Sequence, residues 1–85
     1  MSRPNRTDRS AKNGQYLLKI GGNIRKLRKQ RGYSQEEFAD IACFSRSYVT
    51  EIETGKRNIS VLNLIKIVEA LNVAPNEIIG PIYPK

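Results

Sequence analysis

Short apolar runs with helical spacing recur along this chain, and each is bounded by residues that begin or end helices. The first run consists of apolar residues three or four positions apart: Leu17, Ile20, Ile24 and Leu27. This spacing places the side chains on one face of an α-helix. Gly21 and Gly22 weaken the first turns by about 1 kcal/mol each relative to Ala, so we expect a firm helix only from about Gly22 to Arg31.

Four further runs follow, each opened by a residue that favours a helix N-terminus. Ser34 and Glu37 are the two halves of a capping box, in which the hydroxyl accepts from the third backbone N–H and the carboxylate accepts from the Ser amide. Ser45 and Ser60 are predicted N-caps of a third and a fourth helix, and Pro75 suits the first turn of a fifth. The predicted connections are about two to five residues long. The sequence therefore predicts a compact five-helix, all-α domain.

The distribution of charge indicates a polyanionic partner. The chain has 15 Lys and Arg residues against 8 Asp and Glu residues, a formal net charge of +7. Ten of the basic residues lie in residues 1–31, where Asp8 is the only acidic residue. A one-sided basic segment suits nucleic-acid binding, because each neutralised phosphate releases condensed counterions. The alternative is a solvated segment that only keeps the protein in solution.

Composition also excludes several kinds of chemistry. The chain has no His and a single Cys, Cys43, so the commonest general base, an intramolecular disulfide and a thiol-rich metal site are all missing. No run reaches the roughly 20 apolar residues of a membrane span, and no signal peptide opens the chain. We therefore expect a soluble cytoplasmic protein that is not an enzyme and has no metal, cofactor, small-molecule ligand or membrane contact.

Three segments are predicted along the chain. Residues 1–14 contain almost nothing apolar and end in Asn-Gly, so we expect a flexible basic arm that adds phosphate or minor-groove contacts. Residues 15–80 hold the helical runs and form the domain. Residues 81–85 form a C-terminal tail.

The second and third predicted helices have the spacing of a helix-turn-helix. Ala39 is small enough to let the third helix cross close over the second, while Val49 and Ile52 anchor the third helix from below. At about 100° per residue, residues 46, 47, 50 and 54 then share the outer side. Such a polar ridge fits the DNA major groove, which is about 12 Å wide.

The turn between these helices carries Cys43, where Gly is frequent. A positive φ at Cys43 would cost about 1–2 kcal/mol. We expect a buried small residue here rather than a nucleophile, because the chain has no His to activate the thiol.

The stretch from Ile20 to Ile79 resembles the Cro/CI-type (phage repressor-like, XRE-type) helix-turn-helix domains. The resemblance covers about 60 of the 85 residues and rests on the motifs S-Q-E-E-F-A, E-x-G-K-R-N and S-x-x-N-L. Within the family, ETGKRNIS after a helix that opens S-R-S-Y is similar to controller proteins of restriction–modification systems. The resemblance implies a lambda-repressor-like fold and a transcriptional regulator that binds a double-stranded DNA operator.

The resemblance also implies roles for individual positions. Base edges would be read by Arg46, Ser47, Thr50 and Glu51. Phosphates would be contacted by Gln35, Tyr48, Lys56, Arg57 and Asn58. Arg28 and Glu53 match an ion pair that joins the first and third helices.

Two of these positions have more than one possible role. Glu51 could accept a hydrogen bond from cytosine N4, or it could hold Arg46 in place, which is favoured because it needs no special geometry. Tyr48 could donate to a phosphate or only cover the turn.

The fourth predicted helix is apolar almost all round, with Val61, Leu62, Leu64, Ile65, Ile67, Val68 and Leu71. A small domain could need all of these residues for its core, but a surplus apolar face, followed by Ile78, Ile79, Ile82 and Tyr83, predicts a second copy of the chain as partner. A homodimer through the C-terminal helices would read two half-sites about 34 Å apart. The alternative function is an antitoxin-like or adaptor module that uses the same fold to hold a protein partner.

Overall fold

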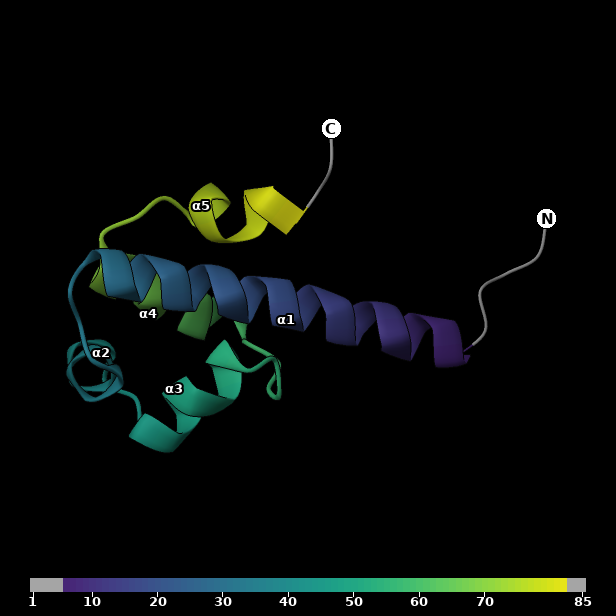
Figure 1. Ribbon diagram of the computed structural model, residues 1–85, viewed down its shortest axis with the longest axis horizontal. Coiled ribbons are helices and arrows are strands. Elements are labelled where there is room, and N and C mark those ends of the chain that lie inside the picture. Colours follow the sequence, from purple (N-terminus) through teal and green to yellow (C-terminus); the bar gives the residue numbers. More distant parts are fainter. Residues whose placement is uncertain (1–5, 83–85) are drawn as a thin grey trace.

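The computed structural model describes residues 6–82 of the chain (Figure 1). Its α-helices are α1 (Arg6–Gln30), α2 (Gln35–Ala42), α3 (Arg46–Glu53), α4 (Val61–Leu71) and α5 (Pro75–Ile79), followed by a 3-10 turn at Gly80–Ile82. No strand occurs in this part of the chain. The prediction of a five-helix, all-α fold is confirmed.

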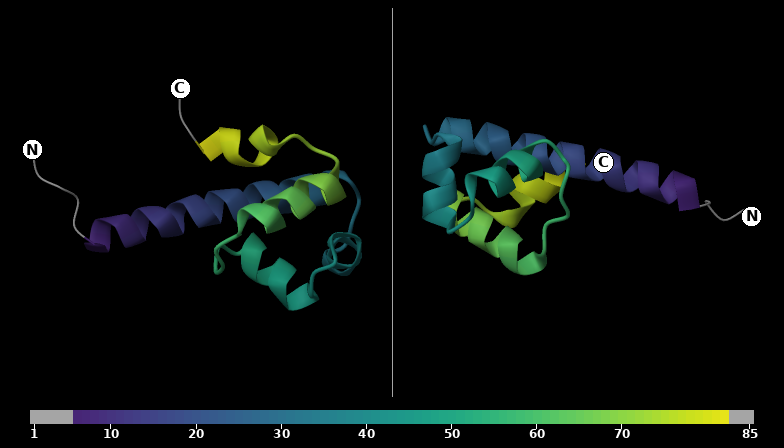
Figure 2. Two further views of the ribbon diagram at one scale, coloured as in Figure 1. Left: turned by 180° about the vertical axis from the view of Figure 1, so that it is seen from behind. Right: turned by 90° about the horizontal axis from the view of Figure 1, so that it is seen from below.

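All five α-helices contribute to one core. Its buried apolar side chains are Ile24, Phe38, Ala39, Ala42, Val49, Ile52, Ile67, Val68, Leu71 and Ile78. α1 packs against α3 on one side and against α5 on another, and α2 contacts both α3 and α4. The first turns of α1 project beyond the other helices in every view (Figures 1 and 2).

The first helix begins much earlier than the sequence predicts. α1 starts at Arg6 rather than near Gly22, so residues 6–14 are helical and not a flexible arm. At Gly21 the low helix propensity is overridden by close packing of α1 on α3, where an added Cβ would overlap Ile52 O and lie 2.9 Å from Glu53 O. The rest of the predicted arm, residues 1–5, lies outside the described residues.

The helix ends follow the predicted capping. The hydroxyl oxygens of Ser34, Ser45 and Ser60 each accept a hydrogen bond from the backbone N–H three residues on, at 3.0, 3.0 and 3.1 Å. Glu37 completes the capping box by accepting from the Ser34 N–H at 2.9 Å. That backbone hydrogen bond and the one to the Ser34 side chain lower the pKa of Glu37. Three serines therefore fix where α2, α3 and α4 begin.

Some apolar side chains of α4 lie in the core, and others are exposed to solvent. The buried ones are Ile67, Val68 and Leu71, and the exposed ones are Val61, Leu62 and Ile65. The sequence pattern predicts Ile78 at the partner surface, and this prediction is wrong because Ile78 is fully buried. α5 packs on α1, where the Asn23 side chain donates to Ile78 O at 2.7 Å, and the Ile78 side chain lies in the core. The side chain of Ile82 and residues 83–85 lie outside what the structure describes.

Candidate nucleic-acid interface

The turn between α2 and α3 is closed by backbone hydrogen bonds. Cys43 takes the left-handed conformation with φ 61° and ψ 42°, and the Phe44 N–H donates to Ala39 O at 2.8 Å. The positive φ expected as one possibility is therefore present. The expectation of a buried side chain is wrong, because Cys43 is exposed. A left-handed residue at a helix end reverses the chain there, which directs this side chain out of the packing between the two helices.

α3 is anchored on one side and open on the other. Val49 and Ile52 are 0% and 1% exposed and lie in the core. On the opposite side Arg46, Ser47 and Thr50 are exposed, whereas Glu51 is half-buried. The outward ridge expected from helical spacing is therefore present at the N-terminal end of α3.

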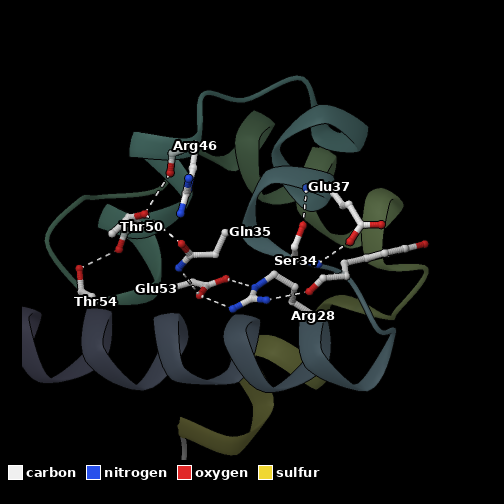
Figure 3. Close-up of polar contacts among 9 residues, drawn as sticks. Arg28, Ser34, Gln35, Glu37, Arg46, Thr50, Glu53 and Thr54 are labelled. Carbon is white, nitrogen blue, oxygen red and sulfur yellow. Dashed lines mark hydrogen bonds and ion pairs between the residues drawn. The ribbon is translucent and has the colours of Figure 1, made fainter.

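A buried ion pair joins α3 to α1. Arg28 Nε donates to Glu53 Oε2 at 2.6 Å and its Nη2 donates to Glu53 Oε1 at 3.0 Å (Figure 3). The two side chains are only 8% and 2% exposed. Arg28 Nη1 also donates to Tyr33 O at 2.7 Å. These bonds satisfy the buried charges, which would be costly if either lacked its partner.

Gln35 links this ion pair to the outer side of α3. Its Nε2 donates to Glu53 Oε1 at 3.2 Å, and its Oε1 accepts from the Thr50 hydroxyl at 3.3 Å (Figure 3). The Thr50 hydroxyl also lies 3.1 Å from the Arg46 carbonyl oxygen. The sequence predicted a phosphate contact for Gln35 and missed these internal bonds. Residues 15 and 18 positions apart carry no local spacing signal that would reveal them.

The loop after α3 folds back onto the helix. Gly55 has φ 74°, and the Lys56 N–H donates to Glu51 O at 2.9 Å. The positive φ suits glycine, and this bond satisfies a carbonyl at the helix end. The reversal brings Arg57 beside Glu51, with Arg57 Nε 2.6 Å from Glu51 Oε2. Hydrogen bonding to Glu51 raises the pKa of Arg57 above its ordinary value.

The favoured role for Glu51, holding Arg46, is therefore wrong. Glu51 and Arg46 are five residues apart on α3, which separates them by about 140° around the helix axis. The partner of Glu51 is Arg57, which comes from the loop. Helical spacing within α3 could not reveal this contact, because it depends on the direction of the chain after Gly55.

Tyr48 connects the turn, the loop and α4. Its ring packs edge-on against Phe44 with centroids 4.8 Å apart, and Arg57 Cζ lies 5.5 Å from the centroid of the Tyr48 ring. The Tyr48 hydroxyl oxygen accepts from Asn63 Nδ2 at 2.9 Å. Tyr48 therefore covers the turn, and its hydroxyl keeps a proton to donate.

Some of the basic residues in residues 1–31 are bonded within the protein. Arg28 belongs to the buried ion pair, and Arg31 donates to Leu71 O at 2.7 Å and to Asn72 O at 2.9 Å. These bonds supply partners to carbonyls at the C-terminal end of α4, where a cation is favourable. The charge distribution places both arginines on a polyanion-binding surface, but Arg28 is buried, whereas Arg31 is exposed and bonded to carbonyl oxygens. Contacts between residues about 40 positions apart are not visible in the sequence pattern.

Residues 6–82 were searched for metal-binding groups and for membrane-spanning helices. Within this range no group of three or more His, Cys, Asp and Glu residues could hold a metal ion. None of the described helices combines the length and apolar character needed to cross a membrane.

Comparison with known proteins gives the family. Residues 24–78 match the family described as Helix-turn-helix. The chain belongs to this helix-turn-helix family. The matched residues begin within α1 and extend into α5, so they include the turn, α3 and the loop after it.

Similar helix-turn-helix proteins are transcriptional regulators and control proteins. The chain is 39% identical over 66 residues to Control protein C.MunI from a Mycoplasma species, spanning 76% of this chain and 89% of that protein. It is 36% identical over 62 residues to the uncharacterized HTH-type transcriptional regulator y4dJ from Sinorhizobium fredii, spanning 73% and 80%. The crystal structure of the restriction-modification controller protein C.AhdI from Aeromonas hydrophila matches with a TM-score of 0.71 at 42% identity, over 73% of this chain and 94% of that one.

Proposed function

We propose that this helix-turn-helix protein regulates transcription by inserting α3 into the major groove of a specific duplex DNA sequence. The observation that carries the proposal is the exposed N-terminal end of α3, held on a rigid support. Arg46 and Ser47 are exposed there, while the same helix is fixed by its buried apolar side and by the Arg28–Glu53 pair. A pre-positioned helix can bring side chains to base edges without ordering them first.

The proposal divides the exposed residues into two groups. Arg46 can bond guanine O6 and N7 with two N–H groups, which discriminates against a wrong base by about 1–3 kcal/mol. Ser47 and Thr50 are its neighbours on the ridge. Phosphate contacts are proposed for Gln35, Tyr48, Lys56, Arg57 and Asn58, which lie at the start of α2, on α3 and in the loop after α3.

Selection from a random duplex pool followed by two substitutions tests this division. Arg46→Ala should lose the preference for bases at one position while keeping its affinity for unrelated duplexes. Lys56→Ala should weaken binding to all duplexes equally and reduce the slope of log affinity against log salt by about 0.9, the loss of one phosphate contact. Equal effects of the two substitutions on selected and unrelated DNA would contradict base reading by α3. Salt-insensitive binding to a protein without duplex preference would favour the interaction-module alternative.

We also propose that the regulator acts as a homodimer through α4. The exposed side chains Val61 and Leu62 are 74% and 71% exposed and lie beside Ile65 on the same helix. Grouped apolar side chains of this size on a small domain are typical of an interaction surface. Sedimentation of the whole chain should show a dimer that Leu62→Glu disrupts. Ile41→Glu is the control, because Ile41 is another exposed apolar residue, 49% exposed, on α2. A monomer at tens of micromolar, with and without selected DNA, would refute the dimer.

The similarity to control proteins suggests what the regulator controls. We propose that it regulates genes of a restriction–modification system, as a cytoplasmic protein that must reach DNA. The named similarities to C.MunI and to the C.AhdI controller support this narrower function. A reporter placed behind the upstream DNA of neighbouring methyltransferase and endonuclease genes should change its expression when the chain is supplied. Absence of such neighbours and of any reporter response would contradict it.

A further inference from the structure

We propose that Glu51 does not read a base but positions Arg57 for a DNA phosphate. This inference rests on the proposed function and assigns one residue a different role within it. Its starting point is that Arg57 bonds Glu51 through Nε, at 2.6 Å. Within the described residues, no hydrogen bond engages the two terminal nitrogen atoms of the same guanidinium. An arginine held in this way can still offer both terminal groups to a phosphate.

Three contacts restrict where this guanidinium can lie. The Glu51 carboxylate bonds the Nε edge of the Arg57 guanidinium, and the centroid of the Tyr48 ring lies 5.5 Å from Arg57 Cζ. The backbone of the same loop is tied to the same glutamate, because the Lys56 N–H donates to Glu51 O at 2.9 Å. Glu51 therefore fixes the loop through its main chain and the Arg57 head group through its side chain.

The support under Arg57 is itself fixed. Tyr48 is packed edge-on against Phe44 and accepts a hydrogen bond from Asn63 of α4. The arginine is thus tied to α3 on one side, and the ring beneath it is tied to α4. Long side chains lose much rotamer freedom on binding, so an arginine that is already ordered binds a phosphate at lower entropic cost.

The same geometry restricts base reading by Glu51. A carboxylate held by Arg57 through Oε2 can reach cytosine N4 only with Oε1, and only in the orientation that Arg57 sets. The Glu51 side chain is 41% exposed, and the Arg57 side chain is 57% exposed. The less exposed partner is the one on α3, whereas the partner that reaches further into solvent is the cation. Because the cation is the more exposed partner, its terminal N–H groups can reach a phosphate.

Two substitutions of equal charge separate positioning from electrostatics. Glu51→Ala and Glu51→Gln both remove the negative charge, but only Gln keeps a side-chain oxygen that can accept from Arg57 Nε. Each is made with Arg57 intact and with Arg57→Ala. Affinity is measured for the duplex that the unmodified chain selects from a random pool and for an unrelated duplex of the same length. Base preference is measured by repeating the selection, and circular dichroism checks that each variant is folded.

With Arg57 present, Glu51→Ala should bind both duplexes about threefold more weakly than Glu51→Gln, as expected from the modest net contribution of one exposed hydrogen bond. With Arg57→Ala the two Glu51 variants should bind equally. The selected sequence should stay the same throughout.

Three results would overturn the proposal while leaving DNA binding intact. These are equal affinities of the two Glu51 variants with Arg57 present, a difference that persists without Arg57, and a changed base preference at one position. The last result is expected if position 51 reads bases, because Gln pairs with adenine where a carboxylate pairs with cytosine. If the unmodified chain selects no duplex at all, the proposed function fails and this role for Glu51 fails with it.

Discussion

Substitution of Gly21 by Ala tests whether contact with α3 or helix propensity controls this part of α1. In an exposed helix interior, Gly→Ala stabilises the fold by about 1 kcal/mol. At Gly21 the added Cβ would overlap Ile52 O and lie 2.9 Å from Glu53 O and 3.0 Å from Glu53 C. These are backbone atoms of α3, so no side-chain rotation can relieve the contact, and α1 and α3 must separate.

The expected change in the free energy of unfolding is the cost of overpacking minus the gain in helix propensity. Overpacking a well-packed site costs about 1–3 kcal/mol, and we expect the upper end because the obstructing atoms are backbone. After subtracting the propensity gain of about 1 kcal/mol, Gly21→Ala should destabilise the fold by about 2 kcal/mol. For a domain of this size, that loss lowers the melting temperature by roughly 8–16 °C.

The neighbouring glycine provides a matched control. Gly22 is exposed on the same helix, and an added Cβ there meets no atom within 4 Å. Gly22→Ala should therefore stabilise the fold by about 1 kcal/mol. Urea denaturation followed by circular dichroism measures both free energies of unfolding. If both substitutions stabilise the protein equally, the close approach of α1 and α3 at Gly21 is refuted.

Three further predictions concern the turn, the ion pair and the capping box. Cys43→Gly should raise the free energy of unfolding by about 1 kcal/mol in thermal denaturation, because φ is positive there, and no gain would contradict the left-handed turn. Glu53→Gln should cost about 3–5 kcal/mol in urea denaturation, because it leaves the Arg28 charge buried without a counter-charge; a loss below 1 kcal/mol would indicate an exposed pair. The lowered pKa of Glu37 means that its stabilising effect is complete above its unfolded value of 4.5 and is lost as the pH falls through the lower folded value. Glu37→Gln should therefore show a flatter acid-denaturation profile, and an unchanged profile would contradict the role of this carboxylate.

Local chemistry explains why most of the helix boundaries could be predicted. A Ser hydroxyl acts on an N–H three residues away, so the starts of α2, α3 and α4 are encoded within one turn of the chain. The start of α1 could not be predicted in the same way, because Gly21 is unfavourable by propensity and favourable only through contact with α3. Propensity is a weak guide where tertiary packing decides.

The candidate site shows the same division between local and distant effects. Arg46 and Ser47 could be assigned to the outer side of α3 from helical periodicity alone, and both are exposed. The partners of Gln35, Glu51 and Arg31 come from other helices or loops. Their bonds depend on how the helices pack, and no single segment of the sequence contains that information.

The ridge of α3 has an evolutionary consequence. Over residues 6–82, the side chains of Arg46 and Ser47 take part in no hydrogen bond or ion pair with the rest of the protein. Substitutions at such surface positions usually change stability by no more than about 0.5 kcal/mol. Under the proposed base-reading role, lineages that inherit this scaffold can exchange these two residues and acquire new operators without first repairing the fold.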